Sequence, residues 1–368
     1  MPDNPRPARV NPPGNLVARE LEARGWSQKD LADIMGRPVQ AINEIIRGTK
    51  QITAATAIEL AGAFETTPEI WLNLETKYRL FMAEKSNKNS AITQKSRLYS
   101  KVPVAEIIRR KWIPAEKNLT QLEKEVCRFL GINCIDDEPD LILSMRHSCD
   151  KQPHDTALTA WMARARNLAV SQSLTAGFRR SEIPALVKDL SLMMKVPEDV
   201  TKVKAALQAH GIRFVLVPHL PKTYLDGAAF FLDPKTETQP VVALTMRYDR
   251  IDWFWFTLLH ELAHLYKNHC TKNGFVLDGE NIADNNSGFE DEANGEAGEW
   301  LIPTSEYARC REKFFSGTAD IKAVALRVGR HPGIVLGRLQ RDGIIPYSRH
   351  RSLLVRIKQH LDAMIDRP

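Results

Sequence analysis

A five-residue motif, HELAH at positions 260–264, constrains the fold of this chain more than any other feature. Histidines four residues apart lie on one face of a helix, where both can bind a single zinc ion. The preceding run IDWFWFTLL is apolar and suits a helix, and Leu258, Leu262 and Leu265 fall on the opposite face. The pattern therefore predicts a largely buried helix whose polar face carries a metal site.

Hydrolysis at such a site requires a base and a third protein ligand. Glu261 lies beside the ligands His260 and His264, and its carboxylate can take a proton from zinc-bound water, so we predict it as the catalytic base. In the next predicted helix, FEDEANGEAGEWLIP, Glu290 shares a face with small and apolar residues that can pack inward. We predict Glu290 as the third ligand of one Zn2+ per chain, with Glu292 as the alternative if the helix starts in another register.

The other histidines, and the tryptophans near the motif, are weaker candidates. His269 lies five residues after the motif and is predicted to face the surface. His210 and His219 lie in or near loops before the predicted sheet, and either of them could face the cleft. Trp253 and Trp255 are interpreted as wall and core rather than as a substrate site.

Near the N-terminus, the spacing of Gln28, Ala32, Gly36, Ile42 and Ile45 is typical of a helix-turn-helix. A small residue allows two helices to cross, glycine tolerates positive φ in the turn, and the isoleucines pack the second helix onto the first. Polar side chains of the second helix can then read base edges or contact phosphates in a major groove. The predicted DNA-contacting residues are Gln28, Arg37, Gln40, Asn43, Glu44, Arg47 and Lys50. Residues 1–80 are neutral overall, which keeps open a helix pair that serves only for dimerisation.

Charge and cysteine content bear on the partners and the compartment. The 368-residue chain has a formal net charge of +6, with an acidic strip from Asp278 to Glu299 and a basic stretch from Arg309 onwards. This distribution indicates a cation site followed by a segment that can touch an anion, although two solvated surfaces would look the same. The sequence has no membrane-length apolar run and no signal-like N-terminus, and its five cysteines form no CxxC pair. We therefore expect a cytoplasmic protein with reduced thiols and no membrane partner.

The pattern of the chain changes from helical to mixed after Gly211. The β-rich runs IRFVLVP, GAAFFLD and QPVVALTM predict a small sheet, and the rest is helical apart from a polar linker at 85–96 and an acidic loop after the motif helix. The predicted fold class is α+β, mainly α with a small β-sheet. The predicted segments are a disordered arm at 1–13, a helix-turn-helix domain at 14–82, a helical connecting or scaffold region at 83–205, a metal-binding domain at 206–348 and a basic C-terminal helix at 349–368.

Two segments resemble known families. Residues 12–82, including PGNLVARELEARGWSQKDLA and TTPEIWLNLETKYRL, resemble Cro/CI-type (XRE) helix-turn-helix domains in the variant of HigA-type antitoxins. Residues 211–348 resemble the ImmA/IrrE family of zinc metallopeptidases, through LDGAAFF, RYDRIDWFWFTLLHELAHL, EDEANGEAGEWLIP and IVLGRLQRDGIIPYS.

The second resemblance implies a zincin-like metallopeptidase domain with the same site residues. His260 and His264 match the family's histidine ligands, Glu261 its catalytic glutamate and Glu290 its third ligand. The chain departs from the family at Glu296, where an aromatic residue is usual, and in carrying an N-terminal DNA-binding domain.

Together these patterns predict a DNA-binding transcriptional regulator that carries a zinc-dependent endopeptidase, a hydrolase. ImmA/IrrE proteins cleave or inactivate transcriptional repressors, so the resemblance implies a regulatory protein as substrate, either a repressor or a toxin–antitoxin partner. The N-terminal resemblance implies a double-stranded DNA operator and a homodimer. The alternative is an antitoxin-like regulator whose zinc domain is a sensor or is catalytically silent.

Overall fold

The computed structural model describes residues 11–85, 88–138, 156–174, 176–233, 235–270, 275–279, 287–311 and 317–367. The chain divides into two compact units, residues 1–95 and 96–368. The predicted arm at 1–13 lies mostly outside the described residues. Within the described ranges, no helix combines the length and the apolar character that a membrane span requires.

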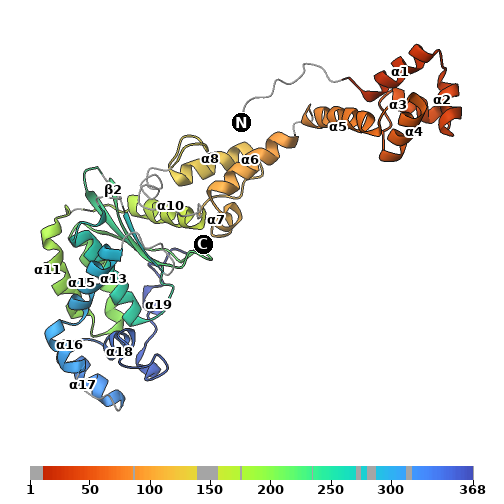
Figure 1. Cartoon of the computed structure of the whole chain (residues 1–368). Coiled ribbons are helices and arrows are strands. Elements are labelled where there is room, and N and C mark those ends of the chain that lie inside the picture. The colour runs from red at the N-terminus through yellow and green to blue at the C-terminus, as the bar shows by residue number, and fades with distance from the viewer. Residues whose placement is uncertain are drawn as a thin grey trace. The chain divides into compact units, whose positions relative to one another are not determined.

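In the described residues of the first unit, all regular secondary structure is helical (Figure 1). Its helices are α1 (Pro13–Arg24), α2 (Gln28–Met35), α3 (Val39–Ile46), α4 (Ala54–Phe64) and α5 (Pro68–Lys85), followed by α6 (Lys88–Lys101), which enters the second unit. The described residues of segment 85–96, expected as a linker, are helical instead. The reason is that Leu98 near the end of α6, and Val102 just after it, are buried in a core and order the helix.

The second unit is built on a four-stranded sheet in the order β1-β3-β2-β4. The strands are β1 (Arg213–Leu216), β2 (Leu225–Asp233), β3 (Thr238–Leu244) and β4 (Phe275–Gly279). β1 runs parallel to β3, and β2 runs antiparallel to both β3 and β4. β4 lies where the sequence predicted part of an acidic loop. It forms because it pairs with β2, more than forty residues earlier in the chain, and no local sequence pattern reveals such a pairing. The fold is mostly helical with one small sheet, which confirms the predicted α+β class.

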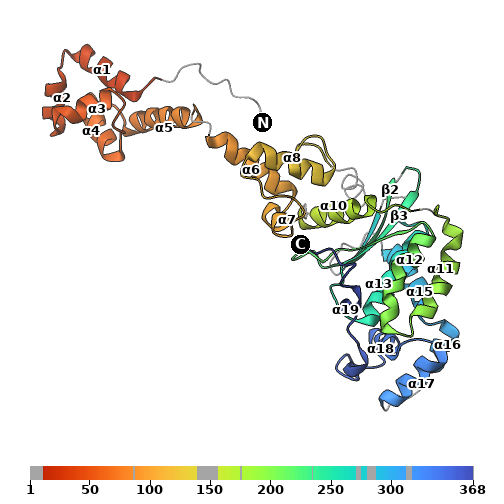
Figure 2. The same cartoon turned by 180° about the vertical axis from the view of Figure 1, so that it is seen from behind.

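Helices from different parts of the chain bury the two faces of the sheet (Figures 1 and 2). Ala229 and Phe231 of β2 face a core shared with α11 (Ile183–Met193), α12 (Val203–Ala209) and α13 (Ile251–Tyr266). Ala228 and Phe230 face the opposite core, shared with α8 (Leu119–Leu130) and α10 (Thr156–Val170), because successive strand residues alternate between faces. The segment expected to be a connecting scaffold therefore supplies one layer of this unit.

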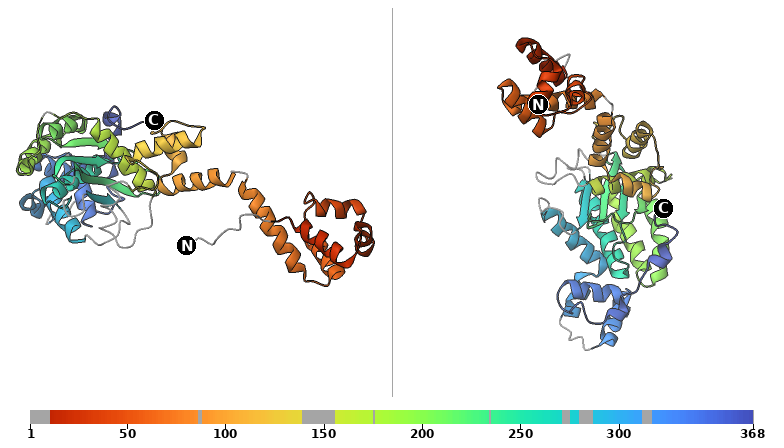
Figure 3. Two further views of the ribbon diagram at one scale, coloured as in Figure 1. Left: turned by 90° about the horizontal axis from the view of Figure 1, so that it is seen from above. Right: turned by 90° about the vertical axis from the view of Figure 1, so that its right-hand side faces the viewer.

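The remaining helices complete the layer that carries the motif. They are α15 (Ser287–Leu301), α16 (Thr304–Arg311), α17 (Thr318–Val328), α18 (Pro332–Arg341) and α19 (Lys358–Leu361), with 3-10 turns at Arg180–Glu182, Pro197–Lys202 and Arg351–Leu353. The short helix α7 (Val104–Arg109) instead packs with α8 and α10 on the opposite face of the sheet. In the right-hand view of Figure 3, α17 and α18, drawn in blue, lie at one end of the unit.

The prediction of a helix at 349–368 is wrong. Its described residues contain only one 3-10 turn and the four-residue α19. Ile365 instead forms a parallel bridge with Leu216, and the backbone N–H of Asp366 donates to Leu216 O (2.9 Å). The end of the chain therefore satisfies the open edge of β1, and this pairing competes with a helix.

Candidate functional site

The first candidate site is the helix-turn-helix formed by α2, a tight turn and α3. Ser27 caps α2, since Asp30 N donates to Ser27 Oγ (3.2 Å) and Ser27 N donates to Asp30 Oδ2 (2.7 Å). Gly36 ends the helix in the left-handed region, with φ of 62°, which glycine adopts at low cost. Ile42 and Ile45 are buried beneath α3, as the spacing predicts.

The predicted DNA-contacting residues differ in how they are presented. Three of them are exposed, Gln40, Arg47 and Lys50, and four are half-buried, Gln28, Arg37, Asn43 and Glu44. Glu44 accepts a hydrogen bond from Gln40 Nε2 (3.0 Å) and lies 3.8 Å from Lys50 Nζ. Arg37 Nη2 donates to Glu59 Oε1 of α4 (3.1 Å), so this guanidinium braces the domain. Polar contacts within the domain therefore hold several of the residues predicted to contact DNA.

This architecture defines the N-terminal unit as a helix-turn-helix DNA-binding domain of the transcriptional-regulator class. Residues 17–71 match the helix-turn-helix family. The chain is 34% identical over 76 residues to an uncharacterised HTH-type transcriptional regulator of Haemophilus influenzae, spanning 20% of this chain and 71% of that protein. The chain therefore belongs, through this domain, to the family of HTH-type transcriptional regulators.

Antitoxins of the HigA type are also similar to this domain. Antitoxin HigA-1 of Vibrio cholerae is 42% identical over 60 residues, which span 16% of this chain and 56% of the antitoxin. An addiction module antidote protein of the HigA family from Coxiella burnetii, with a solved structure, is 37% identical; the match covers 23% of this chain and 94% of that one, with a TM-score of 0.22.

The second candidate site lies where α13 meets α15. His260 and His264 come from α13, and Glu290 comes from the first turn of α15. The Nε2 atoms of the two histidines are 2.8 Å apart. Glu290 Oε2 lies 3.2 Å from His260 Nε2, and Glu290 Oε1 lies 3.5 Å from His264 Nε2. The structure thus brings together the three side chains predicted as ligands.

These three side chains fit a zinc ion. Ligand bonds of about 2.0–2.2 Å in a tetrahedral site place the donor atoms about 3.3 Å apart. The observed separations run from 2.8 to 3.5 Å. Burial, followed by the neighbouring His260 and His269, lowers the pKa of His264 well below its usual value, so this ring is neutral at pH 7. Neutral imidazole is the form that binds metals.

Small residues allow α15 to approach α13. Ala293 and Ala297 are fully buried on the face that also carries Glu290. On a neighbouring side, Lys267 Nζ pairs with Glu296 Oε2 at 2.7 Å. Glu296, which stands where the resembled family usually has an aromatic residue, therefore joins the two helices by an ion pair.

Glu261 is fully buried next to the β2 strand. A Cβ atom added to Gly227 would lie 2.5 Å from Glu261 Oε1, so glycine is what lets the strand approach this carboxylate. Gly227 is not among the site residues predicted from the sequence. The signal that could have identified it is a glycine inside a β-rich run, which often marks a position where another element approaches the backbone closely.

His269 is buried, so the prediction of a surface position is wrong. Only 3% of the residue is exposed, and its Nδ1 lies 2.9 Å from His264 Nδ1. Asn268 takes the left-handed conformation, with φ of 66°, and His269 N donates to His264 O (3.0 Å). This reversal brings His269 back to the predicted ligands, whereas a helical projection assumes that the helix continues.

The other histidines and the tryptophans have different neighbours. His210 Nδ1 contacts Ala206 O (3.1 Å), and His219 lines a separate cavity together with Arg110. Trp255 is buried in the core, and Trp253 lines a cavity near the three predicted ligands.

A cavity of about 340 Å3 lies about one helical turn from the predicted ligands. Its lining includes Phe256, one turn before His260, and Asn294, one turn after Glu290. Arg341 Nη2 donates to Asn294 Oδ1 (2.8 Å), and the guanidinium lies 3.9 Å from the centre of the Phe256 ring. The cavity therefore has an aromatic wall with a guanidinium above it.

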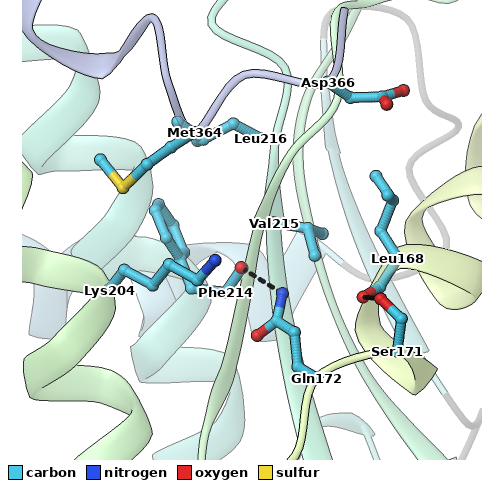
Figure 4. Close-up of a pocket in the computed structure, with 9 residues that line it drawn as sticks. All are labelled: Leu168, Ser171, Gln172, Lys204, Phe214, Val215, Leu216, Met364 and Asp366. Atoms are coloured by element: carbon cyan, nitrogen blue, oxygen red, sulfur yellow. Dashed lines mark hydrogen bonds between the residues drawn. The ribbon is translucent and has the colours of Figure 1, made fainter.

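A smaller cavity of about 160 Å3 lies at the edge of β1 (Figure 4). Gln172 Nε2 donates to Phe214 O (2.9 Å), and Asp366 supplies the backbone bond to Leu216 already described. These contacts satisfy the edge of the strand, so we interpret this cavity as part of the closure of the sheet.

Proposed function

We propose that this protein is a DNA-binding transcriptional regulator that carries a zinc-dependent endopeptidase and cleaves a regulatory protein, such as a repressor. The observation that carries the proposal is the convergence of three ligand atoms from His260, His264 and Glu290, with the buried Glu261 next to them in the chain. The resemblance of residues 211–348 to ImmA/IrrE metallopeptidases supports the same function.

The chain's own residues supply the remaining requirements of peptide hydrolysis. When bound, zinc polarises a carbonyl group and makes water more acidic. The three ligands would hold the ion and leave a fourth position open. Glu261 would take a proton from the attacking water and return it to the leaving amine. The cavity beside Phe256 and Arg341 would receive a side chain of the bound peptide.

Metal analysis of the purified protein, combined with a cleavage assay, tests this proposal. We expect one zinc ion per chain and cleavage of a repressor or antitoxin encoded beside the gene of this protein. A zinc chelator should stop the cleavage, and added zinc should restore it. Purified protein that takes up no zinc would contradict the proposal.

A second candidate function is an antitoxin-like regulator whose metal domain senses rather than cuts. The similarity of the N-terminal domain to Antitoxin HigA-1 favours it. A small toxin gene beside the gene of this protein would support this candidate, whereas a separate repressor gene would support the peptidase. In both cases we infer a homodimer that binds a double-stranded operator in the cytoplasm.

Replacing Asn43 on α3 should weaken operator binding. If its amide contacts a base edge, Asn43→Ala should cost about 1–3 kcal/mol on the specific site and little on unrelated DNA. The measurement is a titration of the full chain with a duplex selected from a random pool. Asn73→Ala, at an exposed position of α5, is the matched control. Equal operator affinities for the two variants would remove Asn43 from the recognition surface.

Replacing Gly227 on β2 should impair cleavage without removing the metal. In Gly227→Ala the new Cβ would overlap with Glu261 Oε1, so the carboxylate must move, at a cost in stability of about 1–3 kcal/mol. Zinc content, thermal unfolding and cleavage rate are measured on the same samples. Gly295→Ala on α15 is the control, because its Cβ would meet nothing within 4 Å. Unchanged cleavage by Gly227→Ala would show that the position of Glu261 is not critical.

A further inference from the structure

Two further side chains, His269 and Glu292, lie next to the group formed by His260, His264 and Glu290. His269 Nδ1 lies 2.9 Å from His264 Nδ1, and His269 Nε2 lies 3.2 Å from Glu292 Oε2. The three side chains form a line that begins at a ligand, passes through a second histidine and ends at a carboxylate.

The ligand geometry places the hydrogen atoms along this line. The Nε2 atoms of His260 and His264 both face Glu290, so a metal bound there leaves the hydrogen of His264 on Nδ1. That N–H requires an acceptor, and its neighbour is Nδ1 of His269. A neutral His269 that accepts at Nδ1 carries its own hydrogen on Nε2, which then donates to Glu292.

We propose that His269 is a positioning residue for the metal ligand His264, and that Glu292 holds His269 in the tautomer that can accept. This inference rests on the metal site of the proposed function but not on proteolysis. Metal-ligating histidines commonly donate their second N–H to a carboxylate or carbonyl, which orients the ring and makes it a better ligand. Here a second histidine lies between the ligand and the carboxylate.

The surroundings of His269 suit a positioning role. Its backbone N–H donates to His264 O (3.0 Å), and its ring stacks on Phe289 with centroids 4.5 Å apart and an interplanar angle of 16°. The side chain of His269 is 3% exposed, whereas that of Glu292 is 61% exposed. The ring is therefore fixed, and the carboxylate stays largely hydrated while one oxygen reaches the ring.

Zinc affinity of the full-length protein, measured by competition with a chromophoric chelator, tests the proposal. His269→Phe keeps a planar ring for stacking on Phe289 but removes the acceptor, and we expect it to weaken zinc binding by about 10- to 100-fold. His269→Gln offers an amide oxygen as a new acceptor and should recover most of the loss. Glu292→Ala changes only an exposed carboxylate and should weaken binding by less than His269→Phe.

The visible spectrum of the cobalt(II)-loaded protein gives a second measurement. We expect His269→Phe to shift it, because a loosened His264 changes the ligand field, and His269→Gln to restore it. Wild-type zinc affinity in His269→Phe would overturn the proposal, as would equal losses in the phenylalanine and glutamine variants. Wild-type affinity in Glu292→Ala would overturn the role of that carboxylate. A wild-type chain that binds no zinc would instead overturn the metal site itself.

Discussion

Replacing Glu261 by glutamine is expected to leave one zinc ion bound per chain and to reduce cleavage of the regulatory substrate by about 10²- to 10⁴-fold. Glutamine has nearly the same shape as glutamate, so it fits the fully buried position against Gly227. Its amide does not accept a proton at neutral pH, whereas the metal ligands are untouched. Zinc content and cleavage rate, measured on one preparation, separate the loss of a base from the loss of the metal.

The control for this variant is Asp291→Asn, which neutralises an exposed carboxylate on α15. It should keep both zinc and cleavage. A Glu261→Gln protein that cleaves at the wild-type rate would refute the peptidase mechanism. If Glu261→Gln still regulates transcription from its operator as the wild type does, the sensing function is favoured over proteolysis.

Replacing Glu290 by alanine should remove zinc during dialysis against a mild chelator. The site then has two protein ligands, and the buried His260 and His264 cannot complete the coordination alone. In the same dialysis Glu292→Ala should retain one zinc per chain, because all three predicted ligands remain. A step of two residues turns a helical side chain by about 200°, so only one of these glutamates can face the ion.

The structure agrees with that geometry, because Glu290 reaches both Nε2 atoms while Glu292 reaches His269. Thermal unfolding of the zinc-free proteins should be similar for the two variants, which shows that the difference lies in the metal site. If Glu292→Ala loses the metal and Glu290→Ala keeps it, the ligand assignment moves by two residues.

Features set by short spacing could be predicted from the sequence alone. A helical repeat places His260 and His264 on one face, and it also separates Glu290 from Glu292. The cap at Ser27 and the left-handed Gly36 follow from the chemistry of single residues, so the boundaries of α2 were predictable. The runs that became β1, β2 and β3 were visible because their residues are β-branched, aromatic or small and apolar.

Features that depend on contacts distant in sequence required the tertiary structure. β4 exists because its backbone pairs with β2, and the end of the chain is not helical because Ile365 forms a bridge with Leu216 at the edge of β1. His269 returns to the ligands only because Asn268 reverses the chain after α13. The need for glycine at position 227 arises only because α13 places the Glu261 carboxylate against β2. Periodicity describes one helix or strand at a time, whereas pairing, chain reversal and close approach are decided where two elements meet.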